Sequence, residues 1–354
     1  MTLHEVFLKN KKIKSGVHPY IIAEIGVNHE GSISNAKKLI EAAARGGAHA
    51  AKFQTYKAEK IASVNSPYYW DLKKEKSKNQ FELFKKYDSF NAHHYKELHN
   101  HCVKNKIDFL STPFDNESVD FLNPLMKYFK IASADLNNIP LLKKIASKKK
   151  PIFLSTGASN LEEIKSSVKL LKKYGINKIA LLHCILNYPT ASHNANLNMI
   201  NSLKKEFVKI KIGYSDHTLP DQDMMVPTTA FLLGAKIIEK HFTLNKKLPG
   251  NDHYHSMDYK DLKKLRSNIN KILNLIGNKK IKGPIPSEKK AIKNARRSIV
   301  VAKKIKKGEK FSEQNLTFKR PAVGLSISEW NKVIGKRSKK NLKEDDVVKK
   351  IHIL

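Results

Sequence analysis

The sequence predicts a (β/α)8 TIM barrel followed by a small β-rich domain. Eight short β-rich runs, each ending in polar groups, alternate with amphipathic stretches of helix length over about 260 residues, the usual span of such a barrel. After residue 276 the composition changes sharply, and the rest has the spacing of short strands and turns. A doubly wound open sheet is the alternative, but the loop at 27–32 is not the glycine fingerprint of a dinucleotide fold.

The eight runs read as buried parallel strands, whose carboxyl-terminal side chains point into the site where such a barrel does its chemistry. They are Tyr20–Gly26, Ala50–Gln54, Asp108–Thr112, Tyr128–Ser133, Pro151–Thr156, Ile179–Cys184, Lys211–His217 and Lys236–His241. Between them, 35–45 and 91–104 read as helices that open on asparagine caps, and 160–173 carries apolar residues at helical spacing.

The chain divides into a barrel domain at 1–276, a glycine-, proline- and lysine-containing linker at 277–295, and a β-rich domain at 296–354. In the last domain we expect strands at 298–302, 316–319 and 347–353. No run is long enough for a membrane helix, and residues 1–14 lack the apolar core of a signal peptide, so a cytoplasmic protein is predicted. The two cysteines, Cys102 and Cys184, are expected to be free thiols.

The formal net charge of +35 raises the question of a nucleic-acid partner. Only six of the 67 cationic residues are arginines, and the lysines are spread over nearly every predicted helix. Nucleic-acid readers concentrate their charge and use arginine for bidentate contacts, so we expect no nucleic-acid partner and no membrane partner. The charge would instead speed capture of an anionic substrate.

Five side chains at or near strand ends describe a pocket for a small polyanion, such as one with a phosphate and a carboxylate. They are Lys52, Thr112, Lys130, Ser133 and Ser215. A lysine within an otherwise apolar strand must be paired or face a ligand, because an unpaired buried ammonium is costly. The alternative for either lysine is a salt bridge to Glu24 or Glu239.

Two histidines, His217 and His241, end the last two predicted strands and would be neighbours. Each could be a satisfied core histidine, but two imidazoles without a nearby cysteine suit a water-rich divalent ion such as Mn²⁺. Glu24 is a candidate base for a metal-bound water, and its alternative role is to pair with Lys52. The polar cluster 250–258 follows directly, and its His253 and His255 are further possible ligands.

These residues carry a resemblance to the sialic acid synthase (N-acetylneuraminate synthase) family. Its motifs run in order over nearly the whole chain: Ala23 to Gly31, Lys52 to Thr55, Ser111 to Phe114, Lys130 to Ser133, Ser155 to Gly157, Tyr188 to Thr190, Gly213 to Thr218 and Glu239 to Thr243. The segment 296–353, with Lys306-Lys307-Gly308-Glu309 and Lys319-Arg320-Pro321, resembles the antifreeze-like (SAF, β-clip) domain that these enzymes append.

The resemblance implies condensation of phosphoenolpyruvate with an N-acylated hexosamine such as N-acetylmannosamine, giving a nine-carbon 2-keto acid and phosphate. It assigns the five pocket residues to phosphoenolpyruvate and His217 and His241 to Mn²⁺ or Mg²⁺. It also implies a homodimer in which the antifreeze-like domain caps the partner's barrel. The residues expected to meet the sugar or the attacking water are Glu24, Gln54, Asp135, Tyr188, Asp252 and Arg320.

Three departures from the family pattern concern the substrate. Leu186 and Asn187 replace the usual polar pair after the sixth-strand cysteine, so a hydrogen bond to phosphoenolpyruvate is either lost or supplied by Asn187. Asp135 stands where a glutamate is common, and the turn at 320–324 has alanine in place of its first glycine. The sugar could therefore be of the N-acetylneuraminate, legionaminate or pseudaminate type. A metal-dependent sugar isomerase and a basic non-enzymatic binding protein are the other function classes.

Overall fold

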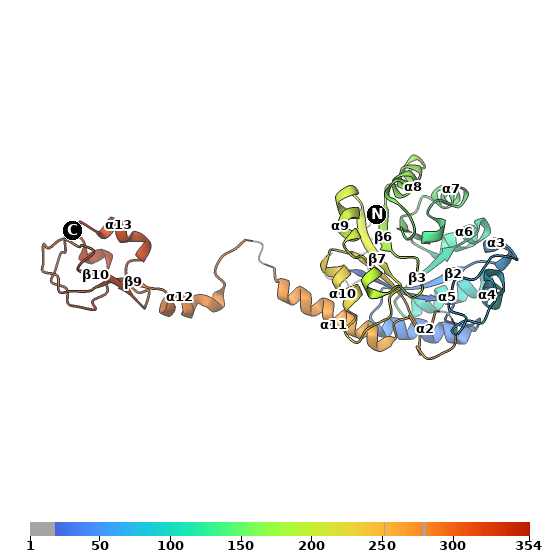
Figure 1. Ribbon diagram of the computed structural model, residues 1–354, viewed down its shortest axis with the longest axis horizontal. Helices are drawn as coiled ribbons and strands as arrows, with labels where there is room; N and C mark the ends of the chain where they lie inside the picture. Colours follow the sequence, from blue (N-terminus) through green and yellow to red (C-terminus); the bar gives the residue numbers. More distant parts are fainter. Residues whose placement is uncertain (1–17, 251, 279–280) are drawn as a thin grey trace. The chain divides into compact units, whose positions relative to one another are not determined.

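The computed structural model describes residues 18–250, 252–278 and 281–354. The segment 1–14, which bears on the signal-peptide prediction, lies outside these residues. The chain forms two compact units that divide between Ile276 and Gly277 (Figure 1). Each unit is described by itself.

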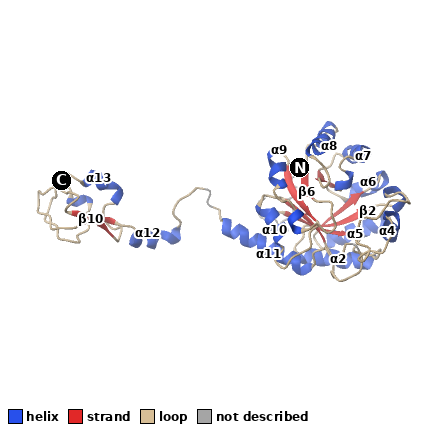
Figure 2. Cartoon of the chain, viewed as in Figure 1, coloured by secondary structure: helices blue, strands red, loops and turns tan. Residues whose placement is uncertain are grey.

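The first unit is a nearly closed barrel of eight parallel strands with its helices on the outside, which confirms the predicted fold (Figures 1 and 2). The strands pair in the order β3-β2-β1-β8-β7-β6-β5-β4, and β3 and β4 lie side by side. Their bounds are β1 Tyr20–Gly26, β2 Ala50–Thr55, β3 Asp108–Pro113, β4 Phe129–Ile131, β5 Ile152–Ser155, β6 Ile179–Cys184, β7 Lys211–Asp216 and β8 Ile237–His241.

The helices of this unit connect successive strands, with α3 and α4 added between β2 and α5. Their bounds are α2 Ile33–Gly46, α3 Ala58–Ile61, α4 Gln80–Tyr87, α5 Ala92–Lys104, α6 Asn116–Leu122, α7 Ile139–Ser147, α8 Leu161–Lys173, α9 Met199–Glu206, α10 Met225–Leu232 and α11 Tyr259–Ile276. Asn91 caps α5 as predicted, but the expectation that Asn35 caps α2 is wrong. The Ser32 hydroxyl accepts from the Asn35 N–H and starts α2 earlier.

Aromatic side chains fill the barrel at the amino-terminal ends of its strands. Tyr20, Tyr128 and Phe153 are fully buried and in mutual ring contact, and the Tyr20 hydroxyl donates to Asp108 Oδ2 at 2.7 Å. Because this layer closes the barrel floor, a small molecule can approach the interior only from the carboxyl-terminal ends of the strands.

The second unit is a small β-rich domain built on the antiparallel pair β9 (Ser298–Val301) and β10 (Leu316–Lys319). The expected strand at 347–353 is wrong: single bridges form at Val347 and Ile353, and 350–352 is a 3-10 helix. The two short helices are α12 (Lys289–Ala295) and α13 (Trp330–Val333). The predicted linker is therefore partly helical, and the Lys293 carbonyl accepts from the Ala322 N–H at 2.7 Å.

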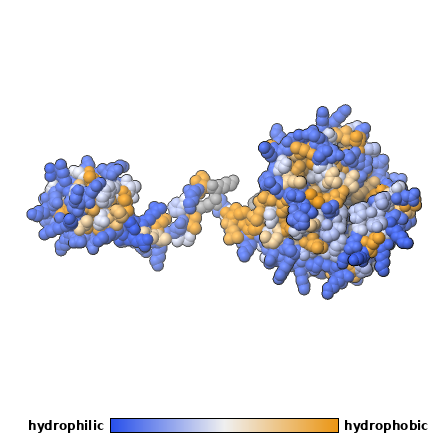
Figure 3. Space-filling view, in the orientation of Figure 1, coloured by the Kyte–Doolittle hydropathy of each residue, from blue (hydrophilic) through white to orange (hydrophobic). Residues whose placement is uncertain are grey.

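Hydrophilic side chains cover most of the face of each unit seen in Figure 3. No helix in the described part of the chain has the length and apolar character needed to cross a membrane. Cys102 and Cys184 are buried free thiols, as predicted.

Candidate active site

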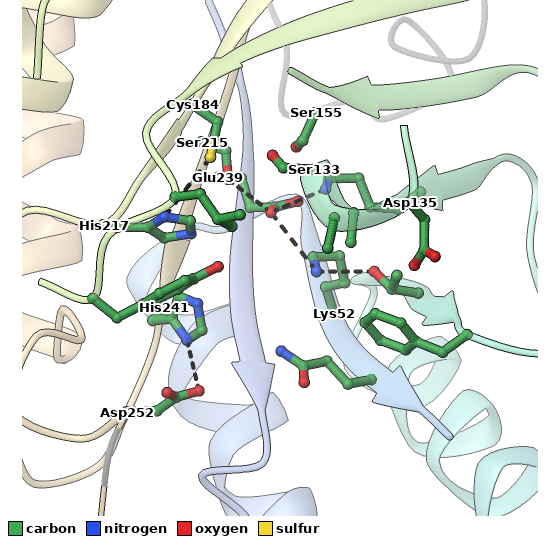
Figure 4. A pocket seen from close by; sticks show the side chains of 18 of the residues that line it. Lys52, Ser133, Asp135, Ser155, Cys184, Ser215, His217, Glu239, His241 and Asp252 are labelled. Carbon is green, nitrogen blue, oxygen red and sulfur yellow. Dashed lines mark hydrogen bonds and ion pairs between the residues drawn. The ribbon is translucent and has the colours of Figure 1, made fainter. Parts of the chain in front are cut away.

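A cavity of about 420 Å³ opens at the carboxyl-terminal ends of the barrel strands (Figure 4). The structure brings to it all but two of the site residues expected from the sequence. Those that line it are Lys52, Gln54, Thr112, Lys130, Ser133, Asp135, Tyr188, Ser215, His217, His241 and Asp252. Glu24 lies behind Lys52, and Arg320 is an exposed residue of the second unit.

Four buried charges form one network at the base of the cavity. Lys52 Nζ lies 2.6 Å from Glu24 Oε2 and 3.7 Å from Glu239 Oε1, and Lys130 Nζ lies 3.6 Å from that same Glu239 oxygen. Ser215 Oγ donates to Glu239 Oε1 at 3.0 Å. Both lysines therefore form the salt bridges that were the alternative to a free ligand-binding ammonium. Glu239 links the two lysines, a central place that the sequence did not indicate.

The strand register explains this arrangement. Glu24 on β1 lies opposite Lys52 on β2 and opposite His241 on β8, while Ser215 on β7 lies opposite Glu239 on β8. Glu239 and His241 lie two residues apart on β8, so they enter the barrel at two successive levels, because alternate residues of each strand face inward.

The network shifts the titration of its members. Burial raises the pKa of Glu239, but the charges of Lys130 and Lys52 outweigh burial, so that pKa lies below its usual value. Burial raises the pKa of Glu24 above its usual value despite the attraction of Lys52. Burial also lowers the pKa of Lys130, because its attraction to Glu239 compensates only in part. Glu239 therefore carries the negative charge that both lysines share.

Lys130 is the cation with the most donor capacity left for a ligand. Its Nζ donates to the Ile131 carbonyl at 3.2 Å, and its nearest carboxylate oxygen is farther than that. Ser133 and Ser155 line the same cavity as Lys130. Ser155 Oγ is buried without a hydrogen-bond partner among the described residues. Ser155 belongs to one of the family motifs but was not expected in the site; it lies one residue before the end of the predicted strand Pro151–Thr156 and ends the observed β5.

The two metal-candidate histidines lie side by side, with ring centroids 5.5 Å apart, on the wall opposite Lys52 and Asp135 (Figure 4). His217 Nδ1 donates to the Ile185 carbonyl at 2.7 Å, and His241 Nδ1 lies 3.1 Å from Asp252 Oδ2. Burial raises the pKa of Asp252, but the attraction of His241 holds it well below its usual range. His217 Nδ1 therefore has an acceptor, which leaves the Nε2 lone pair of that ring for a metal, whereas His241 Nδ1 is paired with Asp252 by charge but forms no hydrogen bond among the described residues.

The loop after β8 adds a third imidazole. His255 is fully buried, and its Nε2 lies 3.5 Å from Asp252 Oδ1. Among the described residues, potential ligand atoms of His241, Asp252 and His255 lie within 4.8 Å of one another. His253, the other loop candidate, instead pairs its Nδ1 with Thr243 Oγ1 at 2.8 Å.

The departure after Cys184 alters the cavity wall. Leu186 lines the cavity, whereas Asn187 is exposed and is not one of the described lining residues. The possibility that Asn187 replaces the missing hydrogen bond is therefore not supported. The Tyr188 ring contacts that of His217 with centroids 4.0 Å apart and planes inclined by 35°. Asp135 accepts from Asn138 Nδ2 at 2.9 Å.

Comparisons with known proteins agree with this geometry. The NeuB family matches residues 39–281, and the SAF domain matches residues 296–354. An N,N'-diacetyllegionaminic acid synthase from Campylobacter jejuni is 46% identical over 337 residues, covering 93% of this chain and 98% of that protein. The protein of the same name from Legionella pneumophila is 38% identical, covering 94% of this chain and 96% of its own.

Among solved structures, the N-acetylneuraminic acid (sialic acid) synthetase from Leptospira borgpetersenii in complex with citrate superimposes with a TM-score of 0.68. It is 34% identical and covers 78% of this chain and 90% of its own.

We expect Glu239→Gln to lower the free energy of unfolding by about 3 kcal/mol or more, because the amide leaves Lys52 and Lys130 buried without a shared counter-charge. Urea denaturation at neutral pH measures this loss. The control is Glu162→Gln, which removes an exposed partner of Lys165 and should leave the midpoint nearly unchanged. Equal losses in the two variants would contradict the network.

Proposed function

Because the chain belongs to the NeuB family, we propose that it is a nonulosonic acid synthase that condenses phosphoenolpyruvate with an N-acylated hexosamine in its aldehyde form. The single observation that carries the proposal is that one cavity is lined both by lysine and hydroxyl side chains and by a pair of histidines. In this reaction C3 of the enol bonds to the aldehyde carbon, water adds at C2, and phosphate leaves. The product is a nine-carbon 2-keto acid.

The base of the cavity suits phosphoenolpyruvate. The ammonium group of Lys130 has a single hydrogen bond among the described residues, to the Ile131 carbonyl, and Ser133 lines the same cavity. Ser133 Oγ accepts from the Gly157 N–H at 2.9 Å, so its own proton can be donated to a ligand. Lys52 and Thr112 extend this donor surface, since Lys52 Nζ lies 3.2 Å from Thr112 Oγ1. Charge-assisted hydrogen bonds of this kind bind phosphate and carboxylate strongly.

The donor set of the histidine wall fits a divalent cation. His217 and His241 would hold Mn²⁺ or Mg²⁺ through Nε2, with Asp252 orienting His241 from behind. When bound, the cation would polarise the aldehyde carbonyl of the sugar. Tyr188, whose ring lies against that of His217, helps to keep the imidazole in place.

Glu24 has both oxygens engaged, one by Lys52 at 2.6 Å and one by Gln54 Nε2 at 3.0 Å. Its role in the proposal is to fix these two side chains. Its role as a base for the attacking water stays a prediction. So do the homodimer, the contribution of Arg320 to sugar binding and the cytoplasmic location.

The outer cavity favours an uncharged sugar. Ile61, Phe84 and Phe114 line it with Leu186, and in the described part of the chain Lys52 and Lys130 are its only lining lysines or arginines. The phosphate of a phosphorylated acceptor would have no lysine or arginine to pair with, because these two lysines would already hold phosphoenolpyruvate. With two relatives named as diacetyllegionaminic acid synthases, we infer a legionaminate-type product ahead of N-acetylneuraminate or a pseudaminate-type acid.

The other function classes explain less of the site. A metal-dependent sugar isomerase would use the histidine pair, but it would give the lysine and hydroxyl side chains at the bottom of the cavity no ligand to bind. A basic binding protein would need its positive charge gathered on one face. Lys144 and Lys148 instead both pair with Asp120, which partly neutralises them.

The test is to incubate the protein with Mn²⁺, phosphoenolpyruvate and one acceptor, and to follow phosphate and 2-keto acid together. The acceptors are N-acetylmannosamine, its 6-phosphate and the di-N-acetylated aminohexose that corresponds to diacetyllegionaminic acid. We expect equal amounts of both products, fastest with the diacetylated sugar and slowest with the phosphate ester. Interconversion of sugars without use of phosphoenolpyruvate would favour the isomerase.

A second prediction concerns the metal. His217→Ala and His241→Ala should each abolish turnover and weaken Mn²⁺ binding by at least tenfold, measured by calorimetry, because each removes one imidazole ligand. The control is His101→Ala, a histidine paired with Glu41 on the outer helices. Tight Mn²⁺ binding in either site variant would show that the ion lies elsewhere.

A further inference from the structure

The loop after β8 places a buried imidazole behind the histidine wall. His255 is fully buried, and the centroid of its ring lies 4.9 Å from that of His241 and 5.3 Å from that of Tyr254. Both ring nitrogens of His255 are buried without a hydrogen-bond partner among the described residues, and so is Nδ1 of His241. A phenylalanine would serve the packing without this cost, because buried polar atoms are almost always satisfied. The imidazole nitrogens therefore point to a ligand.

These nitrogens face the carboxylate of Asp252, which lies on the side of His241 away from His217 (Figure 4). Asp252 Oδ2 lies 3.1 Å from His241 Nδ1, and Oδ1 lies 3.5 Å from His255 Nε2. A dication about 2.1 Å from each donor atom of a tetrahedral site holds those atoms about 3.4 Å apart. The two observed separations bracket this value, so a cation between the three side chains would need only small movements of its ligands.

Backbone and side-chain contacts hold the loop in this position. The His241 carbonyl accepts from the Met257 N–H at 2.8 Å, and the Asp252 carbonyl accepts from the Ser256 hydroxyl at 2.6 Å. Asn28 Nδ2 donates to Ser256 Oγ at 3.0 Å. The donor atoms are thus positioned in advance, which lowers the cost of binding an ion. Asp252 also lines the main cavity, and its side chain is 12% exposed, so an ion can enter from there.

We propose that His241, Asp252 and His255 form a second cation site, which takes Zn²⁺ and competes with the cation of the His217 and His241 pair. Two imidazoles and a carboxylate are a donor set that suits Zn²⁺, whereas Mn²⁺ and Mg²⁺ favour oxygen ligands and keep more water. His241 would bind Zn²⁺ through Nδ1. A neutral imidazole has one lone pair, so Nε2 would then carry the proton and be lost to the other cation. The competition rests on the proposed function, but the Zn²⁺ site does not.

A purely structural role explains less. If His255 only oriented Asp252, the two side chains would share a hydrogen bond, yet His255 Nε2 forms none in the described part of the chain. His253 is the structural histidine of this loop, since its Nδ1 lies 2.8 Å from Thr243 Oγ1. An anion in place of the cation would be repelled by the Asp252 carboxylate.

His255→Phe tests the site, because phenylalanine keeps a ring beside Tyr188 and Tyr254 and removes no hydrogen bond found among the described residues. Zn²⁺ alone is titrated into the wild type and the variant by calorimetry. We expect the variant to bind Zn²⁺ about tenfold or more weakly, because one protein ligand is lost, and to bind Mn²⁺ as the wild type does. In the condensation assay with Mn²⁺ present, the variant should need about tenfold more Zn²⁺ for equal inhibition.

His253→Asn is the matched control, because it removes the neighbouring imidazole of the same loop and should leave Zn²⁺ affinity unchanged. Equal Zn²⁺ affinity in the wild type and His255→Phe would overturn the second site while the proposed function stands. If Zn²⁺ binding depends on His255 but the wild type catalyses no condensation, the proposed function is wrong and the site remains. Should His255→Phe fail to fold, the visible spectrum of the Co²⁺-loaded wild type decides: intense tetrahedral bands support the site, and weak octahedral bands alone contradict it.

Discussion

The arrangement of the barrel interior depends on one buried network of charges, in which Glu239 is shared by Lys52 and Lys130 while Glu24 holds Lys52 from the other side. Removing four charges from water is costly, and the cost is offset only because opposite charges alternate at close range. The strand register places these opposite charges next to one another. The aromatic layer around Tyr20 separates the network from the amino-terminal end of the barrel. The network thus fixes the positions of the two ammonium groups that would hold the anion in the proposed function.

The walls of the cavity above this network differ from one another in chemical character. On one wall, His217 Nδ1 donates to the Ile185 carbonyl, and His241 Nδ1 forms an ion pair with Asp252. Apolar side chains such as Ile61, Phe84 and Leu186 complete the lining. In the proposed condensation the anion and the aldehyde would each meet the surface that suits it.

Much of the fold could be predicted from the sequence, because buried parallel strands are short apolar runs with polar ends, and two of them, Tyr20–Gly26 and Ile179–Cys184, have the predicted bounds. The direction of the strands also predicted which side chains would converge. The sequence named Glu24 and Glu239 as possible partners of the two lysines, but it could not show that both pairs form or that Glu239 is shared, since this depends on the register of neighbouring strands. Loop positions have no periodicity, so the sequence could not distinguish His255, which lies beside Asp252, from His253, which pairs with Thr243.

The most direct test of the account is the dissociation constant of phosphoenolpyruvate, measured by calorimetry in the presence of Mn²⁺ for the wild type and for Lys130→Met. Loss of a charge-assisted hydrogen bond should weaken binding by roughly tenfold or more. Lys127→Met, at an exposed lysine paired with Asp108, should bind as the wild type does. An unchanged constant in a folded Lys130→Met protein would contradict the assignment of the buried network to anion binding.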